Sequence, residues 1–332
     1  MSQLYSSSPG IQHTHGGRAE LFIRLAIGTM FALAVWTVDW VAIRGVPFPD
    51  LQNYIMNFDN GAYYVSADAA SVVEWYAQEY LWRKSIYALK ESFELRSIFS
   101  ALALVALLIF STYVAVKASA PAYLLLLVHP QLVDLAFSQV RSATAMAAMY
   151  LALLLPWRLL KYGFVAVATF IHSAVLVFVG AFAVGQLITR FNVARRHHIL
   201  ISAGYIGAVV VAATLLKSYL LGSIGDRRAT IEVNTSGFLL TIMVTAYAVP
   251  FIFFNQMFSR KFAAFIGLLA SSLCFAMYLY NQNGIRFVAL SLPALAVAIS
   301  GIPDVQWRRL TLTAAVASQV IFFGYWAKGI FR

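Results

Sequence analysis

The stretch SQVRSATAMAAMYLALLLPWRLLKYGFVAVATFIHSAVLVFVGAF, Ser138 to Phe182, places ionisable residues inside long apolar runs. Arg141 opens the first run, His172 lies in the middle of the second, and a short basic connection with Arg158 and Lys161 joins them. An ionisable group at membrane depth is costly and is usually retained for pairing or for chemistry. We therefore expect this hairpin to build a polar site into an apolar scaffold.

The composition around this stretch is that of an integral membrane protein. Of the 332 residues, 61% are hydrophobic and 11% are charged, whereas a soluble domain has about 25% charged residues. Apolar runs of about 17–25 residues can cross a bilayer as helices. We count nine candidate runs, with 163–189 as a tenth apolar element; the nine are approximately 22–43, 98–118, 120–137, 143–157, 199–221, 236–257, 262–281, 286–302 and 310–328. We expect an all-α polytopic membrane protein of about 9–11 transmembrane helices.

The chain is predicted to form a polar cytoplasmic tail, residues 1–20, followed by a single integral membrane domain, 21–332. No small-residue cleavage site follows the first apolar run, which therefore reads as an uncleaved anchor. The only cysteine, Cys274, excludes disulfides and cysteine-based metal sites. The sequence lacks nucleotide-binding and zinc-protease motifs, an Asp pair suited to a divalent cation, and the GxSxG motif. No intramembrane acidic run indicates a proton pump, although Asp39 and Asp134 lie near segment ends.

The net charge of +11 indicates membrane topology rather than nucleic-acid binding, because the basic residues lie in short connections. These residues are Arg158 and Lys161, then Arg190, Arg195 and Arg196, then Arg260 and Lys261, then Arg308 and Arg309. Short basic loops mark the cytoplasmic side. With the N-terminus inside, all of them stay inside only if 163–189 turns near His172 and leaves on the side where it entered. The alternative is one full span, which would put residues 195–198 outside. We favour the hairpin, since broken helices are tolerated where they line a cavity.

This topology leaves four connections outside, namely 44–97, 139–142, 222–235 and 281–286. The first is the longest, and from Ser71 to Leu95 it is amphipathic and rich in aromatic residues. Trp75, Tyr76 and Tyr80 surround Glu79, which suits a helix lying at the outer headgroup level. A sharper interpretation adds that Glu79 points into a cavity.

The outward connections also contain four arginines, Arg141, Arg227, Arg228 and Arg286. Positive charge is under-represented on that side of a membrane, so the presence of four arginines there calls for an explanation. A diphosphate-linked substrate supplies one, because guanidinium groups bind phosphate oxygens in a planar, bidentate fashion. The alternative is that the side chains snorkel to lipid headgroups.

The order of these features resembles a known family, the EpsG branch of the Wzy-type polysaccharide polymerases. The resemblance covers about residues 20–300 and rests on the succession of short motifs rather than on any single one. The motifs are Asp50 and Tyr54; Glu79, Tyr80 and Leu81; Gln139, Arg141 and Ala145; His172 and Ser173; Lys217 and Tyr219; and Asn283 and Arg286. Tyr80 departs from the family pattern, in which proline often follows the glutamate.

The resemblance implies a membrane-embedded glycosyltransferase of the GT-C type in the bacterial inner membrane, with its active site facing the periplasm. Such an enzyme transfers a growing glycan from undecaprenyl diphosphate to the next lipid-linked repeat unit, without metal, cofactor or nucleotide. A chain-length regulator is a possible partner. Two other classes stay open: a related lipid-linked glycan ligase or glycosyltransferase, and a polysaccharide transporter or flippase. The last would need inverted repeats, and no internal repeat is evident.

The implied chemistry assigns roles to the residues of these motifs. Arg141 and Arg286 would stabilise the charge that grows on the leaving diphosphate. His172 or Glu79 would take the proton of the acceptor hydroxyl. Further catalytic and substrate-binding contacts would come from Asp50, Tyr54, Gln139, Lys217, Tyr219, Arg227 and Arg228. The alternatives are a buried His172 bonded to a backbone carbonyl, and a helix cap and interface anchor for Asp50 and Tyr54.

Overall fold

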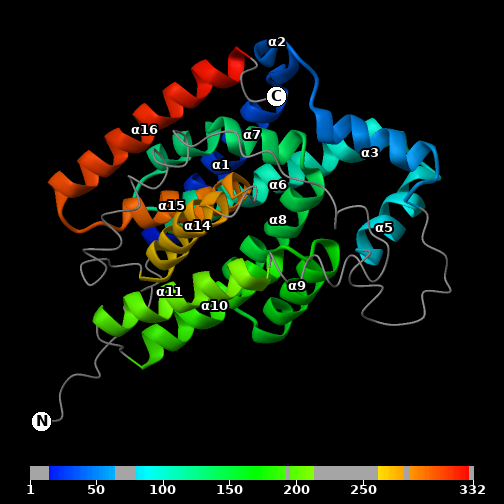
Figure 1. Cartoon of the computed structure of the whole chain (residues 1–332). Coiled ribbons are helices and arrows are strands. Elements are labelled where there is room, and N and C mark those ends of the chain that lie inside the picture. The colour runs from blue at the N-terminus through cyan, green and yellow to red at the C-terminus, as the bar shows by residue number, and fades with distance from the viewer. Residues whose placement is uncertain (1–14, 64–78, 192–194, 213–260, 280–283, 329–332) are drawn as a thin grey trace, which may run out of the picture.

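The structure is a computed structural model that describes residues 15–63, 79–191, 195–212, 261–279 and 284–328 (Figure 1). Every regular element in these ranges is a helix, as the composition predicts. Four helices are long and apolar enough to cross a membrane, and they span 17–37, 95–117, 262–279 and 305–327. Shorter apolar helices cover 140–154, 175–188, 197–211 and 286–300. The chain is therefore an all-α protein with the helices of a polytopic membrane protein.

The centre of the molecule is built from α6 (Leu95–Lys117), α8 (Val140–Leu154), α14 (Lys261–Leu279) and α15 (Ile285–Ser300). Helices α6 and α8 run parallel, since Val140 packs with Phe99 while Tyr150 packs further along against Phe110 and Tyr113. Helix α15 lies antiparallel to α14, and a Cβ on Gly267 of α14 would meet Leu295 of α15. Close packing of small and aromatic residues takes the place of a hydrophobic driving force between helices in lipid.

The path back from the end of α6 to the start of α8 differs from the single span expected at 120–137. It consists of a 3₁₀-helix, η1 (Pro121–Val128), and a short α-helix, α7 (Pro130–Phe137), with His129 in an extended conformation between them. Pro130 explains the break, because a proline restricts the residue before it and cannot donate its own N–H to a helix. Both pieces pack against α15.

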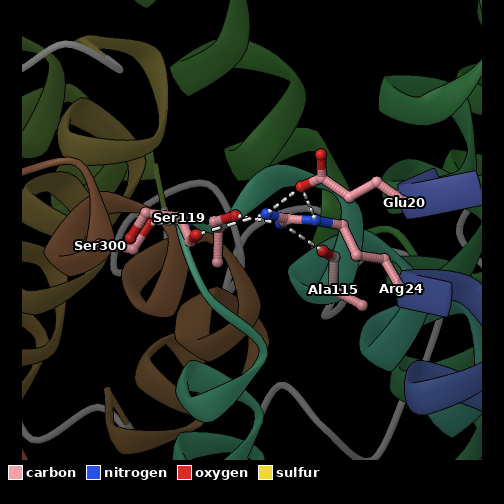
Figure 2. Close-up of polar contacts among 6 residues, drawn as sticks. Glu20, Arg24, Ala115, Ser119 and Ser300 are labelled. Carbon is pink, nitrogen blue, oxygen red and sulfur yellow. Dashed lines mark hydrogen bonds and ion pairs between the residues drawn. The ribbon is translucent and has the colours of Figure 1, made fainter. Parts of the chain in front are cut away.

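One end of the helix bundle is defined by Arg24 of α1 (His15–Thr37) (Figure 2). Its guanidinium donates hydrogen bonds to the carbonyls of Ala115, Ala118 and Ser119 at the C-terminus of α6, at 3.1, 2.9 and 3.4 Å. The Ser119 N–H donates to Ser300 Oγ at 3.1 Å, so α15 also finishes here. We call this the Ser119 end of the molecule.

The opposite end contains the starts of α6, α8 and α15 together with the short helices α2 (Trp40–Arg44), α3 (Pro49–Asp59) and α5 (Tyr80–Lys90). Helix α16 (Val305–Ala327) also finishes here, since Trp326 packs against Trp40 and Phe48. We call this the Glu79 end. The single amphipathic helix expected from Ser71 to Leu95 is not what the described residues form: α5 ends at Lys90 and α6 begins at Leu95. Residues 64–78, including Trp75 and Tyr76, lie outside the described part.

The apolar element at 163–189 is divided at the expected place. Helix α9 (Arg158–Ile171) packs along α8, and α10 (Val175–Arg190) follows after a break at residues 172–174. Phe178 of α10 stacks on Phe287, and Phe182 packs edge-on against Phe262 near the start of α14. The element therefore leaves the Ser119 end as α9, turns at the Glu79 end, and returns as α10. This path agrees with the hairpin rather than with one full span.

Candidate functional site

Glu79 is the residue around which the polar groups of the Glu79 end gather. It is fully buried and lies immediately before α5, with φ 54° and ψ 47°. Among the described residues it is the only one other than glycine with positive φ. The left-handed conformation costs a residue with a Cβ about 1–2 kcal/mol. Strain of this kind persists where the surroundings over-determine the backbone, which is often at functional sites.

Both carboxylate oxygens of Glu79 have partners from distant parts of the chain. Oε2 forms an ion pair with Nη1 of Arg141 in the first turn of α8. Oε1 lies 2.6 Å from Nδ1 of His172 at the break between α9 and α10. The Glu79 side chain therefore points inward to these two partners, whereas the sharper interpretation of the sequence was that it points into a cavity. A buried carboxylate is tolerated only when it is paired and hydrogen-bonded in this way.

His172 is oriented by this contact with Glu79, and not by the backbone carbonyl that was the alternative expectation. Its side chain is 15% exposed. A carboxylate on Nδ1 favours the tautomer with its proton on that nitrogen, which leaves Nε2 as a hydrogen-bond acceptor. Glu79 and His172 therefore have the geometry of a carboxylate–imidazole pair, in which the carboxylate holds the imidazole and stabilises its protonated form.

A second ion pair joins α3 to α15 at the same end of the molecule. Asp50 Oδ2 lies 3.3 Å from Arg286 Nη2, and the side chains are 31% and 49% exposed. Asp50 is in the first turn of α3 but is not its cap, because Phe48 occupies that position. An exposed pair of this kind contributes little stability. An anionic ligand can therefore displace Asp50 and bind the Arg286 guanidinium.

Tyr54 connects the two ion pairs. It follows Asp50 by one turn on the same face of α3, and its ring lies 5.7 Å from Cζ of Arg141. Tyr54 is 8% exposed and packs against Trp82 and Phe99, so it is a buried residue rather than an interface anchor. Burial raises the pKa of the Tyr54 phenol, against the opposing effect of Arg141, so the hydroxyl stays neutral and can donate a hydrogen bond.

Two buried polar atoms at the start of α8 have no hydrogen-bond partner in the described structure. They are Oε1 of Gln139, the N-cap residue of α8, and Nε of Arg141. Buried polar groups are nearly always paired with protein or with water. An acceptor and a donor left open beside Glu79 can therefore serve a bound hydroxyl or water.

The sequence missed a third pair, between Arg44 and Asp134. Arg44 Nη1 lies 3.7 Å from Asp134 Oδ1, and the Trp326 indole donates to the same oxygen at 3.3 Å. Asp134 had stood out only as an acidic residue near a segment end, and Arg44 falls in what looked like a loop. The only available signal was that both are ionisable residues beside apolar runs.

The sequence predicted arginines that bind a diphosphate. In the structure, the arginines of the described cluster are not isolated positive charges. Each guanidinium lies beside a carboxylate: Arg141 with Glu79, Arg286 with Asp50, and Arg44 with Asp134. An anionic ligand must therefore compete with a carboxylate or bind the N–H groups that the carboxylate does not use. Of the other expected contacts, Lys217, Tyr219, Arg227 and Arg228 lie outside the described residues, and so does the motif residue Asn283. Within those residues, no group of three or more His, Cys, Asp or Glu side chains is placed to hold a metal ion.

A cavity of about 430 Å³ lies on the opposite face of α3. Its wall includes Leu51, Ile55, Phe99, Ala103 and Phe137 and is mostly apolar. The size falls within the range of small-molecule pockets, about 300–1,000 Å³. Since the ion pairs are not part of its lining, this cavity suits an apolar group rather than the reacting atoms.

Comparison with models of protein families gives no match, and comparisons with curated proteins and with solved structures give none either.

Proposed function

We propose that this chain is a polysaccharide repeat-unit polymerase of the EpsG-like, Wzy type. It transfers a growing glycan from undecaprenyl diphosphate to the next lipid-linked repeat unit, on the periplasmic face of the bacterial inner membrane. The observation that supports this most is the convergence of the motif residues. Asp50, Tyr54, Glu79, Arg141, His172 and Arg286 come from five separate segments of the chain and meet at one end of an apolar helix bundle.

The orientation of the molecule supports a periplasmic site. The basic connections beside α9, α10 and α16 lie at the Ser119 end, which holds the start of α9, the return of α10 and the start of α16. Short basic loops stay in the cytoplasm. The Glu79 end, with its ion pairs, then faces the periplasm, where lipid-linked repeat units are polymerised.

The leaving group in this reaction is the lipid diphosphate, and Arg286 is its proposed ligand. Half of its side chain is exposed, and its pairing with Asp50 is weak enough to exchange. A guanidinium binds phosphate oxygens in a bidentate, charge-assisted fashion. Negative charge grows on the diphosphate as the anomeric carbon–oxygen bond breaks, so a preorganised cation stabilises the transition state more than the ground state.

The acceptor hydroxyl is activated by His172. As the hydroxyl oxygen attacks the anomeric carbon, its proton moves to Nε2 of His172, and the electron pair of the breaking bond leaves with the diphosphate. Glu79 stabilises the imidazolium that forms. Arg141 keeps the Glu79 carboxylate fixed and charged, so its role is to position the pair. The apolar cavity behind α3 offers space for part of the polyprenyl chain.

The experiment that tests this function is the size of surface glycan in a deletion strain complemented with the gene or with variants. Loss of a polymerase leaves single repeat units attached to the final acceptor, and the intact gene restores a ladder. Polymer that accumulates on the lipid carrier would indicate a ligase instead. Absence of any repeat unit outside the cell would indicate a flippase.

A further inference from the structure

The pair formed by Arg44 and Asp134 lies beside the proposed catalytic site, and the proposed mechanism does not use it. Arg44 is 4% exposed at the end of α2. Its guanidinium lies 5.2 Å from the Phe48 ring and 5.8 Å from the Trp326 ring, and it donates to the Pro47 carbonyl at 3.2 Å. Burying a guanidinium is costly even when it is paired. Such a residue in an apolar scaffold needs a reason beyond stability.

The two carboxylate oxygens of Asp134 have different surroundings. Its contacts with Arg44 and with the Trp326 indole both use Oδ1. Among the described residues, none hydrogen-bonds Oδ2, and the side chain is 23% exposed. Asp134 lies near Asp50 and Arg286, because α7 packs against α15 and because Phe137 of α7 stacks on Phe48 at the start of α3. A carboxylate with one oxygen held and the other without a hydrogen bond from the described residues therefore lies near Asp50 and Arg286.

We propose that Asp134 is a sugar-binding residue whose free Oδ2 accepts a hydrogen bond from the sugar attached to the diphosphate on Arg286. This inference rests on the proposed function and adds to it the recognition of the first sugar. The carboxylates of Asp50 and Asp134 repel phosphate, so the part of the substrate that fits against Asp134 is its uncharged, hydroxyl-bearing part. A hydrogen bond from a hydroxyl to a fixed carboxylate is charge-assisted and strong.

The role of Arg44 follows from this arrangement. Together with the Trp326 N–H, it holds one oxygen of Asp134. Burial raises the pKa of Asp134, and the Arg44 charge and the Trp326 hydrogen bond oppose this rise and favour the carboxylate. Arg44 is thus a positioning residue that acts through Asp134. The contact distinguishes a lipid diphosphate that bears a sugar from the bare lipid diphosphate released by the reaction, which helps product to leave.

The test is equilibrium binding of two probes to the full chain in nanodiscs: undecaprenyl diphosphate, and the same lipid with one sugar. The wild-type chain should bind the glycosylated lipid about 10- to 100-fold more tightly, as expected for one hydrogen bond to a charged group. Asp134→Asn should lose most of this preference and bind the bare diphosphate normally. Arg286→Gln should weaken both probes, and Asp304→Asn, which keeps the cap of α16 at the Ser119 end, should change neither.

A second variant covers the case in which Asp134→Asn fails to fold with Arg44 unpaired. The double substitution Arg44→Met with Asp134→Leu replaces the buried pair by apolar groups, which is often neutral for stability, and it should also lose the preference. A preference retained in either folded variant would overturn the inference while leaving the proposed function intact. Failure of the wild-type chain to bind either probe would overturn the proposed function itself.

Discussion

Among single residues, Glu79 has three features that cost folding free energy. Its carboxylate is buried, its backbone is left-handed, and its two partners must be ordered around it. The ion pair with Arg141 and the hydrogen bond with His172 offset these costs. Each partner comes from a different helix boundary, so the carboxylate fixes the start of α8 relative to the break after α9. The same contacts therefore serve both the local fold and the proposed chemistry.

Glu79→Gln tests the structural part of this role. The amide keeps the shape of the side chain but leaves Arg141 buried without a counter-charge, which should destabilise the protein by about 3–5 kcal/mol. Thermal unfolding of the purified protein measures the loss. Glu91→Gln, in an exposed position after α5, is the matched control and should unfold like wild type. Equal unfolding temperatures for both variants would contradict a buried, ionised Glu79.

His172→Gln tests the chemical part. If His172 accepts the proton, the variant should unfold like wild type but lose about 10²–10⁴-fold in turnover, the usual contribution of general acid–base catalysis. Polymer formed per amount of folded protein is the measurement. Turnover close to that of wild type would move the proton transfer away from His172.

Arg141→Lys separates charge from geometry. The ammonium keeps the positive charge but cannot reproduce the planar group that pairs with Glu79 and covers the Tyr54 ring. We expect a loss of about 100-fold in turnover, as for a small misplacement of catalytic groups. Arg309→Lys, exposed near the start of α16, should be neutral. Comparable activities of the two variants at equal expression would remove Arg141 from the site.

Among the helices, α15 contains Pro293 in its interior, and a side chain of the neighbouring helix α8 hydrogen-bonds the backbone beside this proline. Pro293 cannot donate to the helix. The Tyr150 hydroxyl donates to the Leu290 carbonyl at 2.9 Å and accepts from the Ala294 N–H at 3.3 Å. A side chain from a neighbouring helix thus satisfies the backbone beside the proline, as is common in membrane proteins.

Tyr150→Phe should therefore destabilise the protein by about 1–3 kcal/mol, because buried backbone groups lose their partner. Turnover per folded molecule should stay unchanged, since Tyr150 lies away from the ion pairs of the Glu79 end. The measurements are the unfolding temperature and the activity of the purified variant. Tyr162→Phe is the control, because Tyr162 is 66% exposed on α9. Wild-type stability in Tyr150→Phe would show that the hydroxyl is not needed beside Pro293.

The sequence predicted the helical class and a break near His172, and it singled out Arg141 and His172, because ionisable side chains in apolar runs are conspicuous. Asp50 and Tyr54 were singled out only by the family resemblance, since they lie in a connection between apolar runs. It did not predict which charges pair. Arg44 and Asp134, or Asp50 and Arg286, are far apart in the chain, and no periodicity connects them. The division at Pro130 was not predicted, because the apolar run 120–137 continues on both sides of the proline. The left-handed conformation of Glu79 has no sequence signal, since glutamate rarely adopts it.

At the scale of the whole molecule, the account requires the two ends to lie on opposite sides of the membrane. After Cys274→Ser, single cysteines at His197 and at Trp157 should resist a membrane-impermeant thiol reagent in intact cells, because these positions lie at the basic Ser119 end. A cysteine at Asn53 of α3 should react, because Asn53 is exposed at the Glu79 end. Labelling at position 197 in intact cells would contradict the hairpin formed by α9 and α10.

In the proposed function, this chain alone joins lipid-linked repeat units, and the residues around Glu79 supply the chemistry. The most direct test reconstitutes the purified protein in liposomes with lipid-linked repeat units as the only substrate, and follows glycan length on a gel. We predict a ladder of repeat units from the wild-type protein and only single units from His172→Gln at equal folded protein. Single units from the wild-type protein, or the same ladder from both proteins, would contradict the account.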